Sequence, residues 1–402
     1  MNSQTIYIFN PDHDLALASG ETNYMAPVSA RQMAADLAVL PAWYMPDEAH
    51  ILAPSAYHLD FLATMSNRFH RPMSLITAPE LCNQEHIKIF PWGWNHSLLK
   101  RLLSIGIDEC YLPTKSYIQL IRKYAHRFYA SELLSRLQLN NFFCGEAFWL
   151  RNENDWKDFI EKHERCLLKA PLSGSGKGLN WCKGTFTSSI KGWCSRINTS
   201  QDGIIAEPVY NKTEDFAMEF YSNGNGNVHF VGFSLFHTNK SGMYTSNLLL
   251  SNEEILQYLS TYVPIEELIQ LRDCLIKELS VLLGTFYHGY LGIDMMICHF
   301  PEQKPFYRIH PCVEINLRMN MGVTSRFLAD RYLAPGVTGV FKIIYSSCPT
   351  DIMKVHLHMK DSYPLQTREG QIICGYQPLV PITPQSHYLA FICCGADFSN
   401  YK

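Results

Sequence analysis

The sequence predicts a mixed fold, in which an α/β unit at the N-terminus is followed by α+β units. Two observations lead to this prediction. Over roughly the first hundred residues, short apolar strand patterns alternate with helical patterns, which is typical of an α/β sheet. From Ile204 onward, apolar runs with strand character dominate, and the turn signal Asn223–Gly226 separates two of them as in a β-hairpin.

The N-terminal elements are read from periodicity and from turn residues. Thr5–Phe9 is a β-rich apolar run that ends at Asn10-Pro11, and Ser29–Leu40 has apolar residues at helical spacing before Pro41. Further short strands are expected at 51–52, 74–77 and 87–90. The next part of the chain is predicted to be helical, with one or two helices in Lys115–Leu139 and a short helix in Asp155–His163.

The later part of the chain reads as strands interrupted by one helix, Glu266–Leu283. The strands are expected at Cys166–Lys169, Ile204–Glu207, Phe216–Tyr221, Val228–Phe236, Leu291–Ile297 and Val313–Asn316. His356 and His358 alternate as if on a strand, which favours packing over metal binding, and the adjacent Cys393 and Cys394 are a poor zinc pair.

We divide the chain into four parts on these patterns. Residues 1–112 form an N-terminal α/β domain, 113–205 a central unit, 206–335 a strand-rich unit, and 336–402 an extension packed on the core. Length alone favours two or three packed units.

Composition excludes several classes of function. Hydrophobic residues make up 47% of the 402 residues, which is enough to fill a large core. The formal net charge is −3 without a long basic run, so no nucleic-acid partner is expected. The 13 cysteines are scattered without a C-x-x-C pair, and no membrane span or secretory signal is visible. We therefore expect a cytoplasmic protein with free thiols and no membrane partner.

The first motif is a lysine at the end of a strand followed by a glycine-rich loop. The strand ends at Lys169, and the loop contains Ser173, Gly174, Ser175, Gly176, Lys177 and Gly178. Glycine allows successive backbone N–H groups to approach a phosphate closely. The spacing matches neither a Walker loop nor a dinucleotide-binding fingerprint. By itself the motif is equally consistent with a flexible surface loop.

A second motif places acids at the ends of two strands. Glu207 ends an apolar strand and is followed by Pro208 and Val209, and Glu214 begins the next strand. Carboxylates and backbone groups at such positions can hydrogen-bond an adenine amine and ribose hydroxyls. Two ordinary solvated acids would give the same pattern.

A third motif has the chemistry of a site for a hard cation. Asp294 lies inside an apolar strand, and Glu314 and Asn316 are two residues apart, so that they share one face of a second strand. Oxygen ligands of these types suit Mg²⁺. Arg318 follows, where it can hold phosphate oxygens or, alternatively, pair with a carboxylate.

Together, over about residues 115–330, these motifs resemble the ATP-grasp superfamily. The family pattern is a strand lysine, a small glycine loop, a hinge glutamate, a ribose acid and an acid followed by Glu-x-Asn-x-Arg, which here is Glu314-Ile315-Asn316-Leu317-Arg318. The resemblance implies an ATP-grasp fold preceded by a Rossmann-like pre-ATP-grasp domain.

The resemblance also implies a role for each residue. Lys169 and the loop would contact the phosphates of ATP, Glu207, Pro208 and Val209 the adenine, and Glu214 the ribose. Asp294, Glu314 and Asn316 would bind Mg²⁺, for which Mn²⁺ can substitute. Arg318, Arg308 and Lys177 would act on the transferred phosphoryl group, and Arg127 matches a basic residue that the family carries on a helix before the nucleotide site.

Two features depart from the family pattern. Many family ligases carry an arginine shortly before the first metal acid, whereas this chain has Tyr290-Leu291-Gly292-Ile293 there. We expect Arg308, on the following strand, to supply that charge. The interval between Asp294 and Glu314 is also long, and Pro301–Pro305 reads as an enlarged hairpin tip.

Substrate-binding residues are expected in two places. Asp12, His13 and Asp14 follow the first strand of the α/β sheet, and ligands bind outside the carboxyl ends of such strands. The alternative is a turn in which Asp12 or Asp14 caps a helix. His237 lies in a polar segment, Phe236–Tyr244, that we expect between a strand and a helix, where it either faces substrate or is an exposed connection.

The resemblance implies an ATP-dependent ligase that activates the carboxylate of a small molecule or peptide as an acyl phosphate for attack by an amine or a thiol. A kinase for a small alcohol and a non-catalytic ATP-binding regulatory protein are the alternatives. A homodimer is compatible with this interpretation, and the sequence does not identify the substrates.

Overall fold

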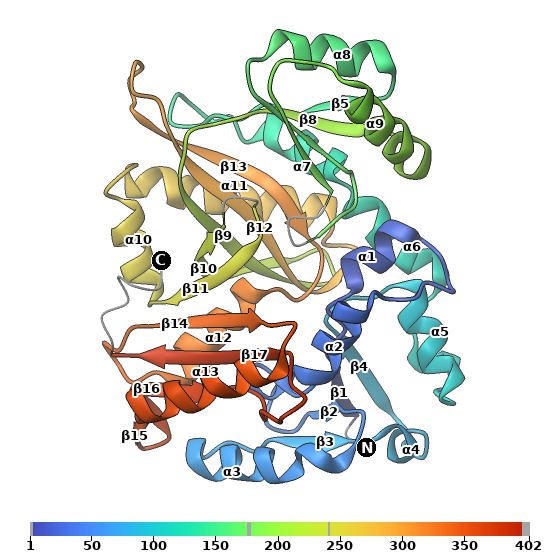
Figure 1. Cartoon of the computed structure of the whole chain (residues 1–402), viewed down its shortest axis with the longest axis vertical. Coiled ribbons are helices and arrows are strands. Elements are labelled where there is room, and N and C mark those ends of the chain that lie inside the picture. The colour runs from blue at the N-terminus through green and yellow to red at the C-terminus, as the bar shows by residue number, and fades with distance from the viewer. Residues whose placement is uncertain (1–2, 175–177, 240–241, 396–402) are drawn as a thin grey trace.

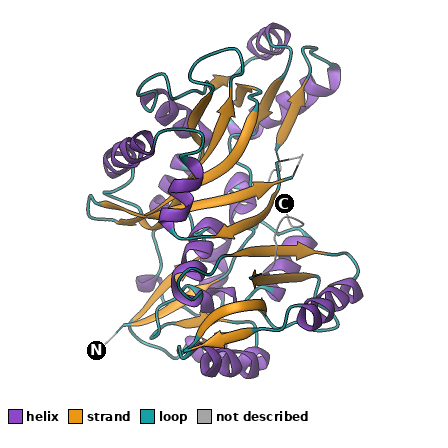
Figure 2. Ribbon diagram, turned by 90° about the vertical axis from the view of Figure 1, so that its left-hand side faces the viewer, coloured by secondary structure: helices purple, strands orange, loops and turns teal. Residues whose placement is uncertain are grey.

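The computed structural model describes residues 3–174, 178–239 and 242–395, and it contains three sheets with helices around them (Figure 1, Figure 2). No helix in these ranges is long and apolar enough to cross a membrane. The predicted α/β plus α+β fold class is confirmed, because one sheet is parallel and the other two are antiparallel.

The N-terminal sheet is parallel and four-stranded. Its order is β3 (Ser74–Ile76), β2 (His50–Leu52), β1 (Gln4–Ile8) and β4 (Ile87–Pro91). The helices around it are α1 (His13–Ser19), α2 (Val28–Asp36), α3 (Leu59–Phe69), α4 (Ala78–Leu81) and α5 (His96–Ser104), with 3-10 turns at Leu40–Trp43, Ala56–His58 and Glu109–Tyr111. Chain order runs outward from β1 in both directions, so the gap between β1 and β4 is a topological switch point.

The central sheet is antiparallel and lies at the top of Figure 1. Two helices, α6 (Lys115–Tyr124) and α7 (Arg127–Arg136), lead to it from the N-terminal sheet. Its order is β5 (Phe148–Leu150), β8 (Ile204–Pro208), β6 (Cys166–Lys169) and β7 (Leu179–Cys182), with the helices α8 (Glu153–Lys162) and α9 (Ser188–Gln201). Trp156 and Ile160 of α8 and Cys194 of α9 pack on the inner residues of β6 and β8 to form a separate small core.

The largest sheet has nine strands, and its neighbours pair in antiparallel fashion. Its order is β13 (Tyr307–Asn316), β12 (His288–His299), β9 (Lys212–Asn223), β10 (Val228–Thr238), β11 (Tyr244–Leu249), β14 (Gly339–Tyr345), β17 (Tyr388–Cys394), β16 (Gln371–Pro378) and β15 (Gln366–Arg368). The helices with it are α10 (Asn252–Leu259), α11 (Ile265–Leu282), α12 (Met321–Tyr332) and α13 (Pro349–Ser362). The chain after residue 335 therefore contributes strands to this same sheet.

Helices pack on the nine-stranded sheet in two distinct cores. In α11 the buried leucines 268, 271, 275 and 279 recur at helical spacing, and they pack against Phe216, Met218 and Phe220 of β9. Val323 and Leu328 of α12 instead share a core with the N-terminal unit and with the C-terminal strands. Strand alternation therefore leaves Ala217 and Glu219 of β9 on the face opposite α11.

Two local expectations are wrong. His356 and His358 lie in helix α13 and not on a strand, because Ile352 and Met359 supply a buried helical stripe that the alternation of two histidines concealed. The segment Phe236–Tyr244 joins two antiparallel strands, β10 and β11, and not a strand and a helix.

Candidate functional site

A buried ion pair joins the two strands at the centre of the central sheet. Lys169 ends β6, and its Nζ lies 2.7 Å from Oε2 of Glu207 in β8. The two side chains are only 6% and 7% exposed. Pro208 and Val209 follow Glu207, but Pro208 has no backbone N–H and that of Val209 donates to the carbonyl of Arg165 at 3.3 Å. Any hydrogen bond from these two residues to adenine would therefore use their carbonyl oxygens.

Arg127 connects the central sheet to the nine-stranded sheet. Its Nη1 donates to the carbonyl of Ala170 at 2.6 Å and to Oγ of Ser173 at 2.7 Å. Its Nη2 donates to Oε1 of Glu314 at 2.7 Å. The side chain is 6% exposed. A planar guanidinium is suited to bridging several acceptors in this way, so Arg127 holds the start of the glycine loop against the expected metal acid.

The described part of the glycine loop closes tightly. The N–H of Ala170 donates to the carbonyl of Gly178 at 2.8 Å, and Gly178 has a φ of +76°, which disfavours other residues. A Cβ on Gly174 would lie 2.3 Å from Oδ2 of Asp14, so the loop starts directly against the N-terminal unit. The expected phosphate contacts Ser175 and Gly176 and the expected catalytic residue Lys177 lie outside the described residues.

The expected metal ligands lie together on neighbouring strands. Asp294 of β12 and Glu314 of β13 are directly paired, and Asn316 occupies the next position on the same face. Burial, with the charges of Glu314 and Glu219, raises the pKa of Asp294 to about 8. This clustering of acids makes the ionised form unfavourable without a cation nearby.

Glu219 belongs to this group and was missed by the sequence analysis. Glu219 of β9 is paired with Gly292 of β12, which in turn is paired with Asn316 of β13. Paired residues share a face of the sheet, so Glu219 lies on the same face as Asp294. Its carboxylate accepts hydrogen bonds from Nδ2 of Asn320 at 2.8 Å and Oγ of Ser234 at 3.0 Å. Burial raises its pKa to about 7, although these two hydrogen bonds act in the opposite direction. The available signal was an acid inside an apolar strand, the same signal that identified Asp294.

Glycines make room for the Glu219 carboxylate. A Cβ on Gly292 would lie 2.4 Å from Oε2 of Glu219, and one on Gly322 would lie 1.9 Å from Oε1. Gly322 is in the first turn of α12, whose N-cap is Asn320. The positive end of this helix therefore faces a buried carboxylate, which is a favourable arrangement.

The N-terminal turn reaches the same site. Oδ1 of Asp14 accepts a hydrogen bond from Nε of Arg318 at 2.7 Å, and Nη2 of Arg318 donates to Oδ1 of Asn316 at 3.0 Å. Burial raises the pKa of Asp14, but the charge and the hydrogen bond of Arg318 bring it below its usual value. Asp12 is at the N-cap position of α1 and makes no capping hydrogen bond with its side chain.

His13 supports this turn from inside. Its ring is 1% exposed, and a Cβ on Gly93 would lie 2.5 Å from it. Burial lowers its pKa to about 4, so the ring is neutral at neutral pH. His13, Asp14, Ser173, Glu314 and Asn316 all line one hollow of about 300 Å³, which includes space open to solvent. The three units of the chain thus meet around one cavity.

Three predicted residues lie away from this cavity. Glu214 pairs with Ile297 on the core face of β9, where its carboxylate accepts hydrogen bonds from the hydroxyls of Tyr258 at 2.6 Å and Tyr262 at 3.1 Å. Arg308 lies toward the hairpin tip, with its guanidinium 4.5 Å from the ring of Phe300. Because side chains alternate along β10, His237 lies on the same face as Leu235, which packs in the core that contains the leucines of α11.

Two further residues take positions that the sequence analysis did not assign. Asp215 is on the face of Ala217 and Glu219, and its carboxylate accepts a hydrogen bond from Oγ1 of Thr238 at 2.7 Å. His310 of β13 is fully buried, and neither ring nitrogen has a hydrogen-bond partner among residues 3–174, 178–239 and 242–395. Burial, with the charge of Lys169, lowers the pKa of His310 to about 3.

The donors fit a hard divalent cation only in part. Asp294, Glu314 and Asn316 supply oxygen ligands. In the described part of the chain, however, no three His, Cys, Asp or Glu side chains are grouped so that they could hold a metal ion. Mg²⁺ commonly uses one or two carboxylates and takes its remaining ligands from water and substrate phosphates, so these residues fit Mg²⁺ that arrives with a nucleotide.

Comparison with known structures establishes the fold as the ATP-grasp fold with an N-terminal α/β domain. An N5-carboxyaminoimidazole synthetase from Staphylococcus aureus, complexed with ADP, superimposes with a TM-score of 0.50 at 12% identity, over 99% of this chain and 95% of that one. A biotin carboxylase from Campylobacter jejuni, in a β,γ-ATP complex, gives a TM-score of 0.51 at 12% identity, over 98% and 88%. No protein-family model and no curated protein sequence matches the chain.

Proposed function

We propose that the protein is an ATP-dependent ligase that activates a carboxylate of a small molecule or peptide as an acyl phosphate, which an amine, or less readily a thiol, then attacks. The observation that carries the proposal is the set of contacts around the hollow that Asp14, Glu314 and Asn316 line. Arg127 bonds to Glu314, Asp294 is paired with Glu314, and Arg318 bonds to Asp14, while the buried Lys169–Glu207 pair lies in the central sheet that Arg127 connects to this group. ATP would be the phosphoryl donor and Mg²⁺, or Mn²⁺ in its place, the cation.

The nucleotide would bind between the central and nine-stranded sheets. Lys169 offers a cation to the phosphates, and Glu207 fixes its position through their ion pair. The ring nitrogens of buried His310 have no hydrogen-bond partner in the described part of the chain, so His310 is a further candidate for contact with a polar heterocycle such as adenine. Asp215 replaces Glu214 as our candidate for the ribose hydroxyls, because only Asp215 is on the face of the other acids.

The cation and the arginines would stabilise the transferred phosphoryl group. Mg²⁺ bound by Asp294, Glu314 and Asn316 would neutralise phosphate charge during transfer. Arg318, held by Asp14 and Asn316, presents a fixed guanidinium to the same place. Phosphoryl transfer depends mainly on positioning and charge stabilisation, which are the two things this arrangement offers.

A binding and turnover experiment tests the proposal. We expect MgATP at millimolar concentration to raise the melting temperature by mass action, and GTP to raise it less. Glu314→Gln should reduce ADP formation on the order of 100-fold, since it removes one charge from the metal site. Glu302→Gln, at the exposed hairpin tip, is the matched control and should turn over like the parent.

The products separate this function from its alternatives. A ligase releases free phosphate only when carboxylate and amine are both present, whereas a kinase leaves the phosphate on its product. A regulatory ATP-binding protein would show the melting shift without turnover. Absence of any melting shift, or undiminished ADP formation by Glu314→Gln, would contradict the roles assigned above.

A further inference from the structure

A second hollow lies beside the catalytic one, at the carboxyl ends of β1 and β4. It encloses about 490 Å³, which includes space open to solvent. The gap between β1 and β4 is the switch point of the parallel sheet, where open α/β sheets characteristically bind ligands. Leu317, next to Arg318, lines both hollows, so a molecule in the second hollow lies next to the proposed phosphoryl-transfer site.

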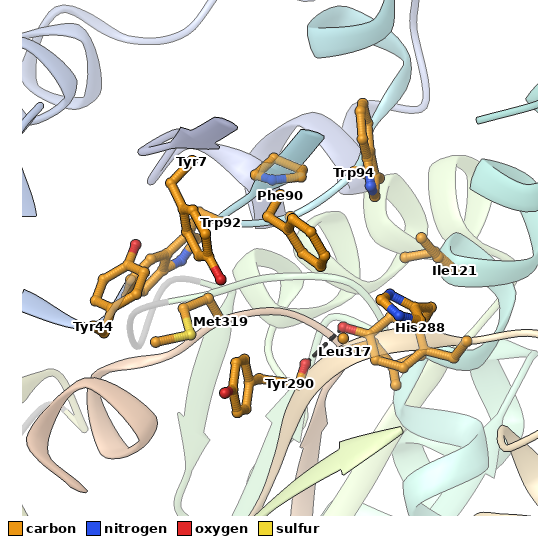
Figure 3. Close-up of a pocket in the computed structure, with 14 residues that line it drawn as sticks. Tyr7, Tyr44, Phe90, Trp92, Trp94, Ile121, His288, Tyr290, Leu317 and Met319 are labelled. Carbon is orange, nitrogen blue, oxygen red and sulfur yellow. Dashed lines mark hydrogen bonds between the residues drawn. The ribbon is translucent and has the colours of Figure 1, made fainter. Parts of the chain in front are cut away.

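The walls of this hollow are mainly aromatic. Tyr7 of β1 and Phe90 of β4 are paired in register and stacked, with ring centroids 5.5 Å apart and an interplanar angle of 16°. Figure 3 shows them on one side, with Tyr290 and Met319 facing them from the other. Trp92 and Tyr44 close one end, their ring centroids 6.4 Å apart. Tyr7 and Phe90 belong to the N-terminal sheet and Tyr290 to β12 of the nine-stranded sheet, so the two sheets form opposing walls of the hollow.

The walls carry no formal charge. None of the residues that line the hollow is Asp, Glu, Lys or Arg. The one histidine, His288, has its pKa lowered by burial and by the charge of Lys88. Lys88 lies outside the lining, with its Nζ 4.9 Å from the Phe90 ring. A phosphate or carboxylate inside the hollow would therefore lose water without gaining an ion pair, which is unfavourable.

Several of these aromatic side chains remain reachable from solvent. Tyr7, Phe90, Trp94 and Tyr290 are partly exposed and not sealed in a core. Figure 3 shows the Tyr7 hydroxyl directed toward the opposite wall. A flat ring would find stacking surfaces there together with polar groups for atoms at its edge.

We propose that this hollow binds a flat, uncharged aromatic or heteroaromatic group of the substrate, whose reacting carboxylate or amine extends past Leu317 toward Arg318. This proposal rests on the proposed function for the direction of the reacting group. The binding of the ring itself depends only on the hollow.

Saturation-transfer NMR on the full-length protein, with and without MgADP, tests the proposal. The probes are benzamide, indole and quinoline as uncharged aromatic rings, cyclohexanecarboxamide as a non-aromatic control, and ribose 5-phosphate as a charged one. We expect the aromatic probes to bind and both controls to bind at least about five-fold more weakly, since aromatic contacts of this kind contribute about 1 kcal/mol each.

Variants on both walls locate the binding. Phe90→Ala and Tyr290→Ala should each weaken aromatic probes by about five-fold. Because they lie on different strands, a folding defect in one leaves the other informative, and melting curves identify such a defect. Tyr345→Ala, on the half-exposed outer part of β14, is the matched control and should bind the probes like the parent.

Two results would overturn the proposal: no binding of any aromatic probe, or preferred binding of ribose 5-phosphate that Phe90→Ala weakens. The melting shift with MgATP is recorded on the same samples. A protein that binds MgATP but no aromatic ring retains the proposed function and loses this inference. A protein that binds the rings but not MgATP retains this inference and loses the proposed function.

Discussion

The buried pair between Lys169 and Glu207 allows a quantitative prediction. Lys169→Met keeps most of the side-chain volume but leaves the Glu207 carboxylate, 7% exposed, without its partner at 2.7 Å. Removing one member of a buried pair typically costs about 3–5 kcal/mol, because the remaining charge stays desolvated. This is a large part of the roughly 5–15 kcal/mol that stabilises a typical domain.

The double variant Lys169→Met/Glu207→Gln should be more stable than the single one by about 2 kcal/mol or more, because no uncompensated charge remains. Two-state unfolding is typical of small single domains and is not assumed for a chain of 402 residues with several separate cores, so hydrogen exchange of the β6 and β8 amides is the appropriate measurement of local free energy. It is to be read beside urea unfolding curves.

The reasoning would be refuted by a single variant that loses less than about 1 kcal/mol, or by a double variant that loses as much as the single one.

Two other predictions concern the buried acids of the nine-stranded sheet. Gly322→Ala should lower stability by about 1–3 kcal/mol, since its Cβ would lie 1.9 Å from Oε1 of Glu219. Gly192→Ala is the control in the same melting assay. It lies in helix α9 with nothing within 4 Å of the new Cβ, and it should raise stability by about 0.5–1 kcal/mol. The pKa values of Asp294, about 8, and Glu219, about 7, lie above those of the same groups in the unfolded chain. Without nucleotide, the free energy of unfolding should therefore fall between pH 6.5 and 8, by up to about 1.4 kcal/mol per pH unit for each proton that the folded protein retains and the unfolded chain has lost. Asp294→Asn should flatten this slope, and an equal slope in that variant would exclude Asp294 as its source.

Local sequence patterns determined the elements that carry most of the site. The strand Cys166–Lys169 was predicted with its observed bounds, because an apolar run before a glycine-rich loop is a purely local signal. The two-residue spacing of Glu314 and Asn316 likewise predicted that these two side chains share a face, and the register of β12 against β13 adds Asp294 to it.

Tertiary structure decided what local patterns could not. Glu214 and Asp215 differ by one position, and since side chains alternate along a strand, only the register of β9 against β12 puts Asp215 on the face of the acids. The aromatic hollow depends on Tyr7, Phe90 and Tyr290, which come from three strands of two sheets and have no common motif. Strand alternation acts over neighbouring residues and is visible in the sequence, whereas the approach of two sheets depends on how distant cores pack together.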